Sequence, residues 1–246
     1  MHIPMTEDDD YRLRKFKRLF FRDGNQWEAK EGTIRGLIAI ESSPLTWFCY
    51  LHLHVGGYRP VVLPCTYYCF RKDCDGENPG HALPVAAHVD RRHITFLRKK
   101  KLGMPMGLRD NLPAFTLVKL KLKRLSPTES LHDPYLVALL LALGQRQWRM
   151  LGQEQTRQAA GVTPKVLFSS EDHDHLYLYS AKISSSLLSM FDDPATAPSA
   201  PDSLPIQITS IPYKPHETLR GRLLALLLSA TSPLDVDKAE NLIVYT

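Results

Sequence analysis

Apolar and polar residues alternate along two neighbouring stretches in the first quarter of the chain. Residues 46–55 (TWFCYLHLHV) are rich in aromatic and branched side chains, and they lead through two glycines into residues 58–64 (YRPVVLP). This pattern predicts a β-hairpin. Residues 33–41 (TIRGLIAIE) have a similar composition and predict a preceding strand.

Two later stretches, residues 85–97 and 114–124, also predict strands. In the second of them Val118, Leu120 and Leu122 alternate with Lys119, Lys121 and Lys123. Such alternation is typical of a half-buried strand, here with a basic face toward solvent. We therefore expect residues 32–125 to be rich in β-structure.

The hydrophobic period changes at residue 132. His132-Asp133-Pro134 is a good helix start, because Asp133 can accept hydrogen bonds from free amides and proline suits the first helical position. The apolar run that follows predicts a buried helix over about 133–151.

The remaining elements predict an α-β-β-α-β-α order. We expect a hairpin from 165–169 and 175–183, a short helix at 186–191, a strand at 206–211 and a helix at about 217–230. The sequence therefore predicts an α+β (mixed α/β) fold, with a basic N-terminal segment over 1–31 and one domain over 32–246. Within that domain, residues 126–246 form the α/β part, and the proline-rich stretch 194–205 is a surface linker.

Composition places the chain among ordinary globular proteins. Of its 246 residues 43% are hydrophobic, which excludes a wholly disordered chain, and 13 glycines and 18 prolines without a fixed period exclude a collagen-like one. The longest nearly unbroken apolar run, residues 135–143, is shorter than the roughly 20 residues that cross a bilayer. The N-terminus has acids where a secretory signal is positive. These features predict a cytoplasmic or nuclear protein with reduced cysteines and no membrane partner.

The positive charges are concentrated. Although the net charge is only +5, 16 of the 31 lysines and arginines lie in residues 11–22, 91–101 and 119–124, which contain no acid. Such stretches are typical of surfaces that bind nucleic acid or an acidic protein. The first stretch could instead form an amphipathic helix that Phe16, Leu19 and Phe20 anchor to the sheet. The residues expected to contact a nucleic acid are Arg98, Lys99, Lys100, Lys101, Lys119, Lys121 and Lys123. They favour a non-catalytic binding or accessory protein.

Three stretches in the second half carry a resemblance. They are LHDPYLVALLLALGQRQWR (131–149), VLFSSEDHDHLYLYSAKISSSLL (166–188) and IPYKPHETLRGRLLALL (211–227). Together they resemble a group of uncharacterised intracellular proteins of filamentous fungi. The resemblance implies a fungal source, and it leaves open an accessory role or an enzymatic role in a fungal metabolic pathway.

The second half also resembles a restriction-endonuclease-like core with a degenerate PD-(D/E)XK motif. That motif places an acid on one strand and acid-x-lysine on the next, where hard oxygen ligands hold Mg²⁺. The matching residues are Asp172 or Asp174 followed by Lys182, with Ser180 at the position of the second carboxylate. The resemblance implies a metal-dependent nuclease in which Glu171 would have to compensate for that serine. The alternative is a solvent-exposed hairpin turn.

Two further groups contain metal-ligating side chains. Cys65, Cys69, Cys74 and His81 are four candidate zinc ligands, although their spacing is not the usual two-residue knuckle and the first two cysteines could be core residues. The pairs His52 and His54, and His173 and His175, could bind a metal or transfer protons.

Overall fold

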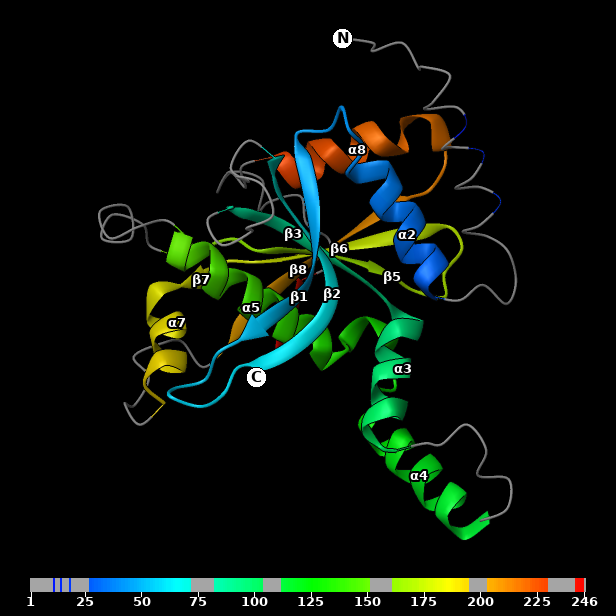
Figure 1. Ribbon diagram of the computed structural model, residues 1–246, viewed down its shortest axis with the longest axis vertical. Helices are drawn as coiled ribbons and strands as arrows, with labels where there is room; N and C mark the ends of the chain where they lie inside the picture. The colour runs from blue at the N-terminus through cyan, green and yellow to red at the C-terminus, as the bar shows by residue number, and fades with distance from the viewer. Residues whose placement is uncertain are drawn as a thin grey trace.

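A seven-stranded sheet forms the centre of the computed structural model, which describes residues 11, 14, 18, 27–71, 82–103, 112–150, 161–194, 203–229 and 242–245 (Figure 1). Its strand order is β1-β2-β3-β5-β6-β8-β9. All neighbours are antiparallel except β3 and β5, which are parallel. The strands are β1 (Leu45–Leu53), β2 (Val61–Phe70), β3 (Pro84–Asp90), β5 (Lys165–Ser169), β6 (His175–Ala181), β8 (Leu204–Pro212) and β9 (Leu242–Tyr245).

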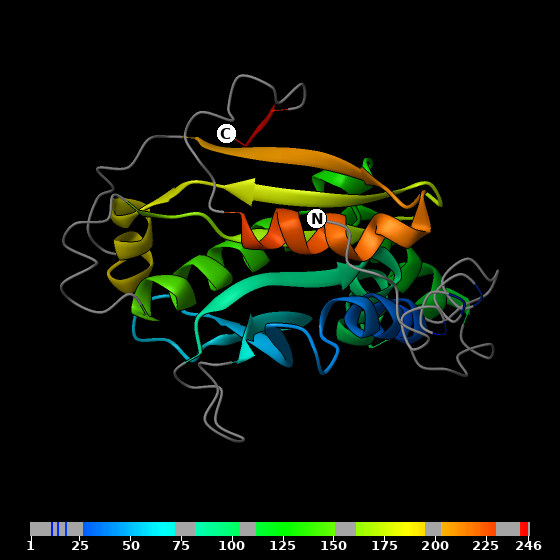
Figure 2. The same cartoon turned by 90° about the horizontal axis from the view of Figure 1, so that it is seen from above.

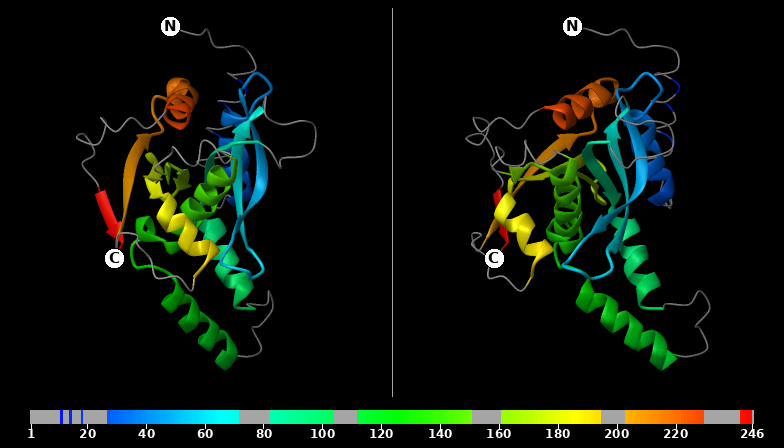
Figure 3. Two further views of the ribbon diagram at one scale, coloured as in Figure 1. Left: turned by 90° about the vertical axis from the view of Figure 1, so that its left-hand side faces the viewer. Right: turned by 60° about the vertical axis from the view of Figure 1, so that its left-hand side comes forward.

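Helices cover both faces of this sheet. Helix α5 (Pro134–Met150) packs on one face, with α7 (Ser185–Asp192) beside it (Figure 3). Helices α2 (Trp27–Ile38) and α8 (His216–Leu228) pack on the other (Figure 2). Successive strand residues point to opposite faces, so the sheet contributes to two hydrophobic cores. A separate two-stranded sheet consists of β4 (Gly161–Val162) and β7 (Ile183–Ser184).

The predicted α+β class is confirmed. The β1–β2 and β5–β6 hairpins, α5, α7, β8 and α8 all occur close to their expected positions. Asp133 accepts a hydrogen bond from the Tyr135 amide at 2.9 Å, and α5 begins at Pro134, as the sequence predicts. The short β4 and β7 and the terminal β9 were not expected.

Three predicted strands in the first half are wrong, wholly or in part. Residues 33–41 lie mostly in α2, where Ile34, Leu37 and Ile38 form one buried helical face. Residues 114–124 belong to helix α4 (Leu112–Leu125), because leucine and lysine are strong helix formers and none of the described strands lies beside the segment. Residues 85–97 begin as β3 but continue as helix α3 (Arg91–Lys101), which the Asp90 side chain caps.

Two expected boundaries cut through observed elements. Helix α2 spans the expected junction between residues 31 and 32, and Trp27, Lys30 and Glu31 pack with the domain. Strand β8 begins at Leu204, inside the expected linker, and residues 195–202 lie outside the described residues. Within the described part of the chain, no helix has the length and apolar character needed to cross a membrane.

A buried lysine closes the C-terminal end of α8. Lys165 at the start of β5 is only 5% exposed, and its Nζ donates to the carbonyl oxygens of Leu226 and Ser229, each at 2.6 Å. It also donates to the Leu227 carbonyl at 3.3 Å. Burial lowers the pKa of this amine, and the carbonyl oxygens at the negative end of the helix dipole compensate for its charge.

We expect Lys165→Met to lower the free energy of unfolding by about 2–4 kcal/mol, because the carbonyl oxygens of Leu227 and Ser229 lose their lysine donor and Leu226 keeps only the Ser229 hydroxyl. Urea denaturation of the variant and of Lys182→Met, an exposed lysine after β6, measures this effect. Equal stability of the two variants would contradict the capping role.

Candidate functional site

Helices α3 and α4 extend away from the sheet and its covering helices as an arm (Figure 1). The arm, defined as residues 91–101 and 112–125, carries six basic residues on α3 and four on α4, and neither helix contains an acid. Since the whole chain has a net charge of +5, the residues outside these two helices are net negative. The fold therefore joins two basic stretches that are separate in the sequence into one cationic projection.

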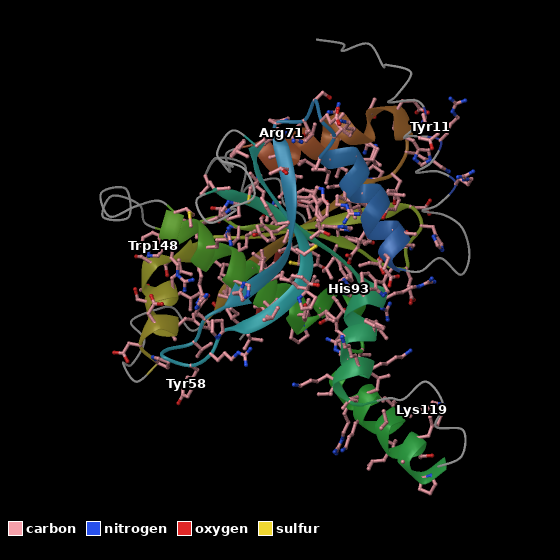
Figure 4. The ribbon with its side chains drawn as sticks, viewed as in Figure 1. Tyr11, Tyr58, Arg71, His93, Lys119 and Trp148 are labelled. Atoms are coloured by element: carbon pink, nitrogen blue, oxygen red, sulfur yellow. The ribbon has the colours of Figure 1, made fainter. Side chains whose placement is uncertain are left out.

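Most of these cations face solvent. Lys99, Lys100 and Lys101 on α3 and Lys119, Lys121, Lys123 and Arg124 on α4 are all exposed. Figure 4 shows Lys119 on the outer helix, far from the sheet. The arm also exposes Phe96, Phe115, Leu117, Leu120 and Leu125. An open depression on α4 is lined by Thr116, Lys119, Leu120, Leu122, Lys123 and Ser126. Exposed apolar groups among cations are typical of a contact surface.

Arg98 has a different position from the other predicted nucleic-acid ligands. Its two terminal nitrogens donate to the two carboxylate oxygens of Asp133, at 2.8 and 2.6 Å, and its side chain is 18% exposed. Because Asp133 also caps α5, this bidentate pair ties the arm to the domain. The structure thus places Arg98 in an anchor of the arm.

The base of the arm contains a buried polar network. Glu31 on α2 accepts hydrogen bonds through Oε1 from the Asp90 amide at 2.9 Å and from the His93 ring at 2.8 Å. The Trp27 ring stacks on His93 with centroids 3.6 Å apart. Figure 4 shows His93 at the top of α3, where the arm leaves the domain. The network therefore fixes the direction in which α3 leaves the sheet.

Asp90 is the most unusual group in this network. It is 1% exposed, and Oδ1 accepts from the Arg92 amide at 2.8 Å while Oδ2 has no hydrogen-bond partner among the described residues. Burial raises its pKa to about 6, although the hydrogen bond from the Arg92 amide and the Lys30 charge oppose the shift. Burial also lowers the pKa of Lys30, which is 2% exposed. Both groups are therefore held where their charged forms are disfavoured.

The raised pKa of Asp90 gives stability a definite pH dependence. The folded protein holds this proton up to about pH 6 and the unfolded chain only to about pH 4, so the free energy of unfolding falls by about 3 kcal/mol as the pH rises through this range. We expect Asp90→Asn, which keeps an acceptor for the Arg92 amide, to stabilise the protein at about pH 7 by about 1–3 kcal/mol. Urea denaturation at about pH 4 and pH 7 should show the difference between variant and wild type only at the higher pH. If Asp90→Asn lowered the free energy of unfolding equally at both pH values, the role assigned to the Asp90 proton would be wrong.

A serine–histidine pair lies beneath the network but is closed to substrates. His88 Nε2 lies 2.8 Å from Ser169 Oγ, an arrangement that could activate a serine nucleophile. Both residues are 0% exposed, and burial lowers the pKa of His88 to about 4. We therefore assign this pair to the core.

The predicted PD-(D/E)XK residues do not converge. Asp172 and Asp174 lie in the turn between β5 and β6, whereas Lys182 follows the last residue of β6. The seven-residue strand between them spans roughly 20 Å. Glu171 in the same turn pairs with Arg91 of the arm at 3.4 Å. The structure thus brings the acids, but not the lysine, to the base of the arm.

The predicted zinc ligands are only partly described. Cys65 and Cys69 lie on β2 inside the α5-side core and are 4% and 0% exposed, while Cys74 and His81 fall outside the described residues. Burial strongly raises the pKa of the Cys65 thiol, which disfavours the thiolate that zinc requires. No group of three or more His, Cys, Asp or Glu side chains suited to a metal occurs among the residues that the structure describes.

The sequence did not identify Glu31, Asp90 or His93 as members of a site. The available signal was a run of polar residues after an apolar strand, including Asp90, Arg92 and His93, which could have indicated the start of α3.

The chain matches no family model, and no curated protein or solved structure is significantly similar to it.

Proposed function

We propose that this protein binds nucleic acid through the arm formed by α3 and α4. The observation that carries the proposal is the concentration of ten basic residues on two adjoining helices without an acid. Lysine and arginine bind phosphate by charge and hydrogen bonds, and each neutralised phosphate releases counterions.

The distribution of charge around α4 favours a nucleic acid over an acidic protein. Successive helix residues are about 100° apart, so Lys119 and Lys121 point to different sides of the helix. A single acidic protein face would pair with only some of these cations. Phosphates on a flexible or grooved nucleic acid can reach several sides at once.

The exposed aromatic residues of the arm support the same ligand. Phe96 is 45% exposed on α3 and Phe115 is 39% exposed on α4, both near lysines. Aromatic side chains beside cations can stack on unpaired bases. We therefore expect single-stranded ligands to bind at least as tightly as duplexes.

Fluorescence anisotropy with labelled single- and double-stranded DNA and RNA, at two salt concentrations, tests the proposal. Products are run on a gel with Mg²⁺ present, so that any cleavage is seen. We expect affinity to fall steeply with salt. Absence of salt-dependent binding would overturn the proposal, and preferential binding of polyglutamate would identify an acidic protein as the ligand class.

A further inference from the structure

Asp172, in the turn between β5 and β6, is hydrogen-bonded to His175 and Tyr177 at the start of β6, and the binding surface uses none of the three. Asp172 Oδ2 accepts from the Tyr177 hydroxyl at 2.7 Å and lies 3.1 Å from His175 Nδ1. Asp172 Oδ1 accepts from the Asp174 amide at 2.7 Å, and the Asp172 amide donates to Ser170 Oγ at 2.9 Å. These bonds fix the aspartate in one orientation.

The hydrogen bonds also fix the proton on the histidine ring. Partial burial alone would raise the pKa of Asp172, but hydrogen bonds from the Asp174 amide, Tyr177 and His175 hold it below its ordinary value. The charged carboxylate can only accept hydrogen bonds. His175 Nδ1 therefore carries a hydrogen atom and donates a hydrogen bond to Asp172. In the neutral form of the ring, the lone pair is then on Nε2. Within the described residues Nε2 makes no hydrogen bond, and the side chain is 40% exposed.

This turn lies at the base of the arm. Glu171, next to Asp172, pairs with Arg91, the first residue of α3, and both side chains are at least one-third exposed. On its other side the turn is held by the Tyr213 amide, which donates to the Asp174 carbonyl at 2.8 Å. The ion pair therefore places the turn that contains Asp172 beside the first residue of α3.

We propose that His175 is the general base of a metal-independent ribonuclease site, with Asp172 as its positioning residue, acting on RNA held by the arm. A neutral imidazole oriented by a carboxylate is suited to remove a proton from a hydroxyl group. The proposal rests on the proposed nucleic-acid binding and narrows its substrate to RNA, because only RNA supplies a 2′-hydroxyl next to the scissile phosphate.

The reaction is an internal transesterification. His175 Nε2 takes the proton of the 2′-hydroxyl, the 2′-oxygen forms a bond to phosphorus, and the bond from phosphorus to the 5′-oxygen breaks. The leaving 5′-oxygen takes a proton from water, and the resulting hydroxide takes the proton from the imidazolium ring. The products are a 2′,3′-cyclic phosphate and a 5′-hydroxyl end, with no oxidation, reduction or other reactant.

The test uses the full chain, 5′-labelled single-stranded RNA with EDTA present, and DNA of the same sequence. We expect cleavage of RNA alone, with 2′,3′-cyclic phosphate ends, and loss of roughly 100-fold or more of the rate in His175→Ala. Added imidazole should restore part of that rate, which a structural role would not explain. Asp172→Asn should lower kcat while KM for RNA stays unchanged. His52→Ala serves as the matched control, because His52 is exposed on β1 at the far edge of the sheet.

RNA binding measured on the same samples separates the two proposals. Absence of cleavage with binding intact would overturn the ribonuclease site alone. Absence of both would overturn the proposed function as well. Cleavage that persists in His175→Ala, or that needs a metal ion, would also overturn the assignment.

Discussion

Replacing Lys119, Lys121 and Lys123 together with glutamine should lower the affinity for single-stranded nucleic acid roughly 10- to 100-fold. The three amines are exposed on α4, and glutamine keeps the length and helix propensity of the side chain while removing its charge. The slope of log affinity against log salt should decrease by up to about 3, one for each lost phosphate contact. Anisotropy titrations over a range of salt concentrations measure both quantities.

A variant with the same change in charge elsewhere is the control. Arg59, Lys182 and Lys214 are exposed and lie outside the arm. Their joint replacement with glutamine lowers the net charge equally, so it should change affinity far less than the α4 variant. If both triple variants bind equally weakly, the overall charge of the protein, and not the arm, attracts the ligand.

Replacing Asp133 with alanine should cost about 3–5 kcal/mol of the free energy of unfolding, because it leaves the partly buried Arg98 guanidinium without its carboxylate. The same change removes the cap of α5, a loss of about 1 kcal/mol included in that range. Urea denaturation followed by circular dichroism measures the total.

Two comparison variants separate the contributions of Asp133. Asp133→Asn keeps an oxygen for the Tyr135 amide but loses the charge, so it should be intermediate in stability. Asp192→Ala removes an exposed aspartate at the end of α7 and should change stability little. If Asp133→Ala were no less stable than Asp192→Ala, the anchoring role of the Arg98–Asp133 pair would be wrong.

Local signals made the second half of the fold predictable. The start of α5 could be recognised because Asp133 accepts a hydrogen bond from the Tyr135 amide and Pro134, which has no N–H group, suits the first helical position. The β5–β6 hairpin was predictable for the same reason, since its polar turn and both of its strands are contiguous in the sequence.

The same reasoning failed where packing partners decide the structure. In residues 117–124 the alternation of leucine and lysine has the period of a strand, but none of the described residues of α4 is buried, so no core-facing stripe identified the helix. In α2, Ile34 and Ile38 favour β-structure, yet they pack on the sheet as one helical face.

Site residues divide along similar lines. The lysines of the arm were predicted as a group because they are close together in the sequence, whereas Asp172 and His175 were named only in separate groups, with Lys182 and with His173. Glu31 and His93 are 62 residues apart, and Arg98 and Asp133 are 35 apart. Contacts across such separations depend on the folded chain, so the sequence could not show that Arg98 is an anchor.

The position of the arm within the chain has a consequence for how this protein can diverge. Strands β3 and β5 are parallel, so the connection between them must cross the molecule, and α5 makes that crossing. The arm is inserted in this connection, between the end of β3 and the start of α5. Its length and charge can therefore vary while the register of all seven strands is retained, provided that the anchor residues at its base are kept. A change in the arm alone would therefore be enough to give a related chain a different ligand.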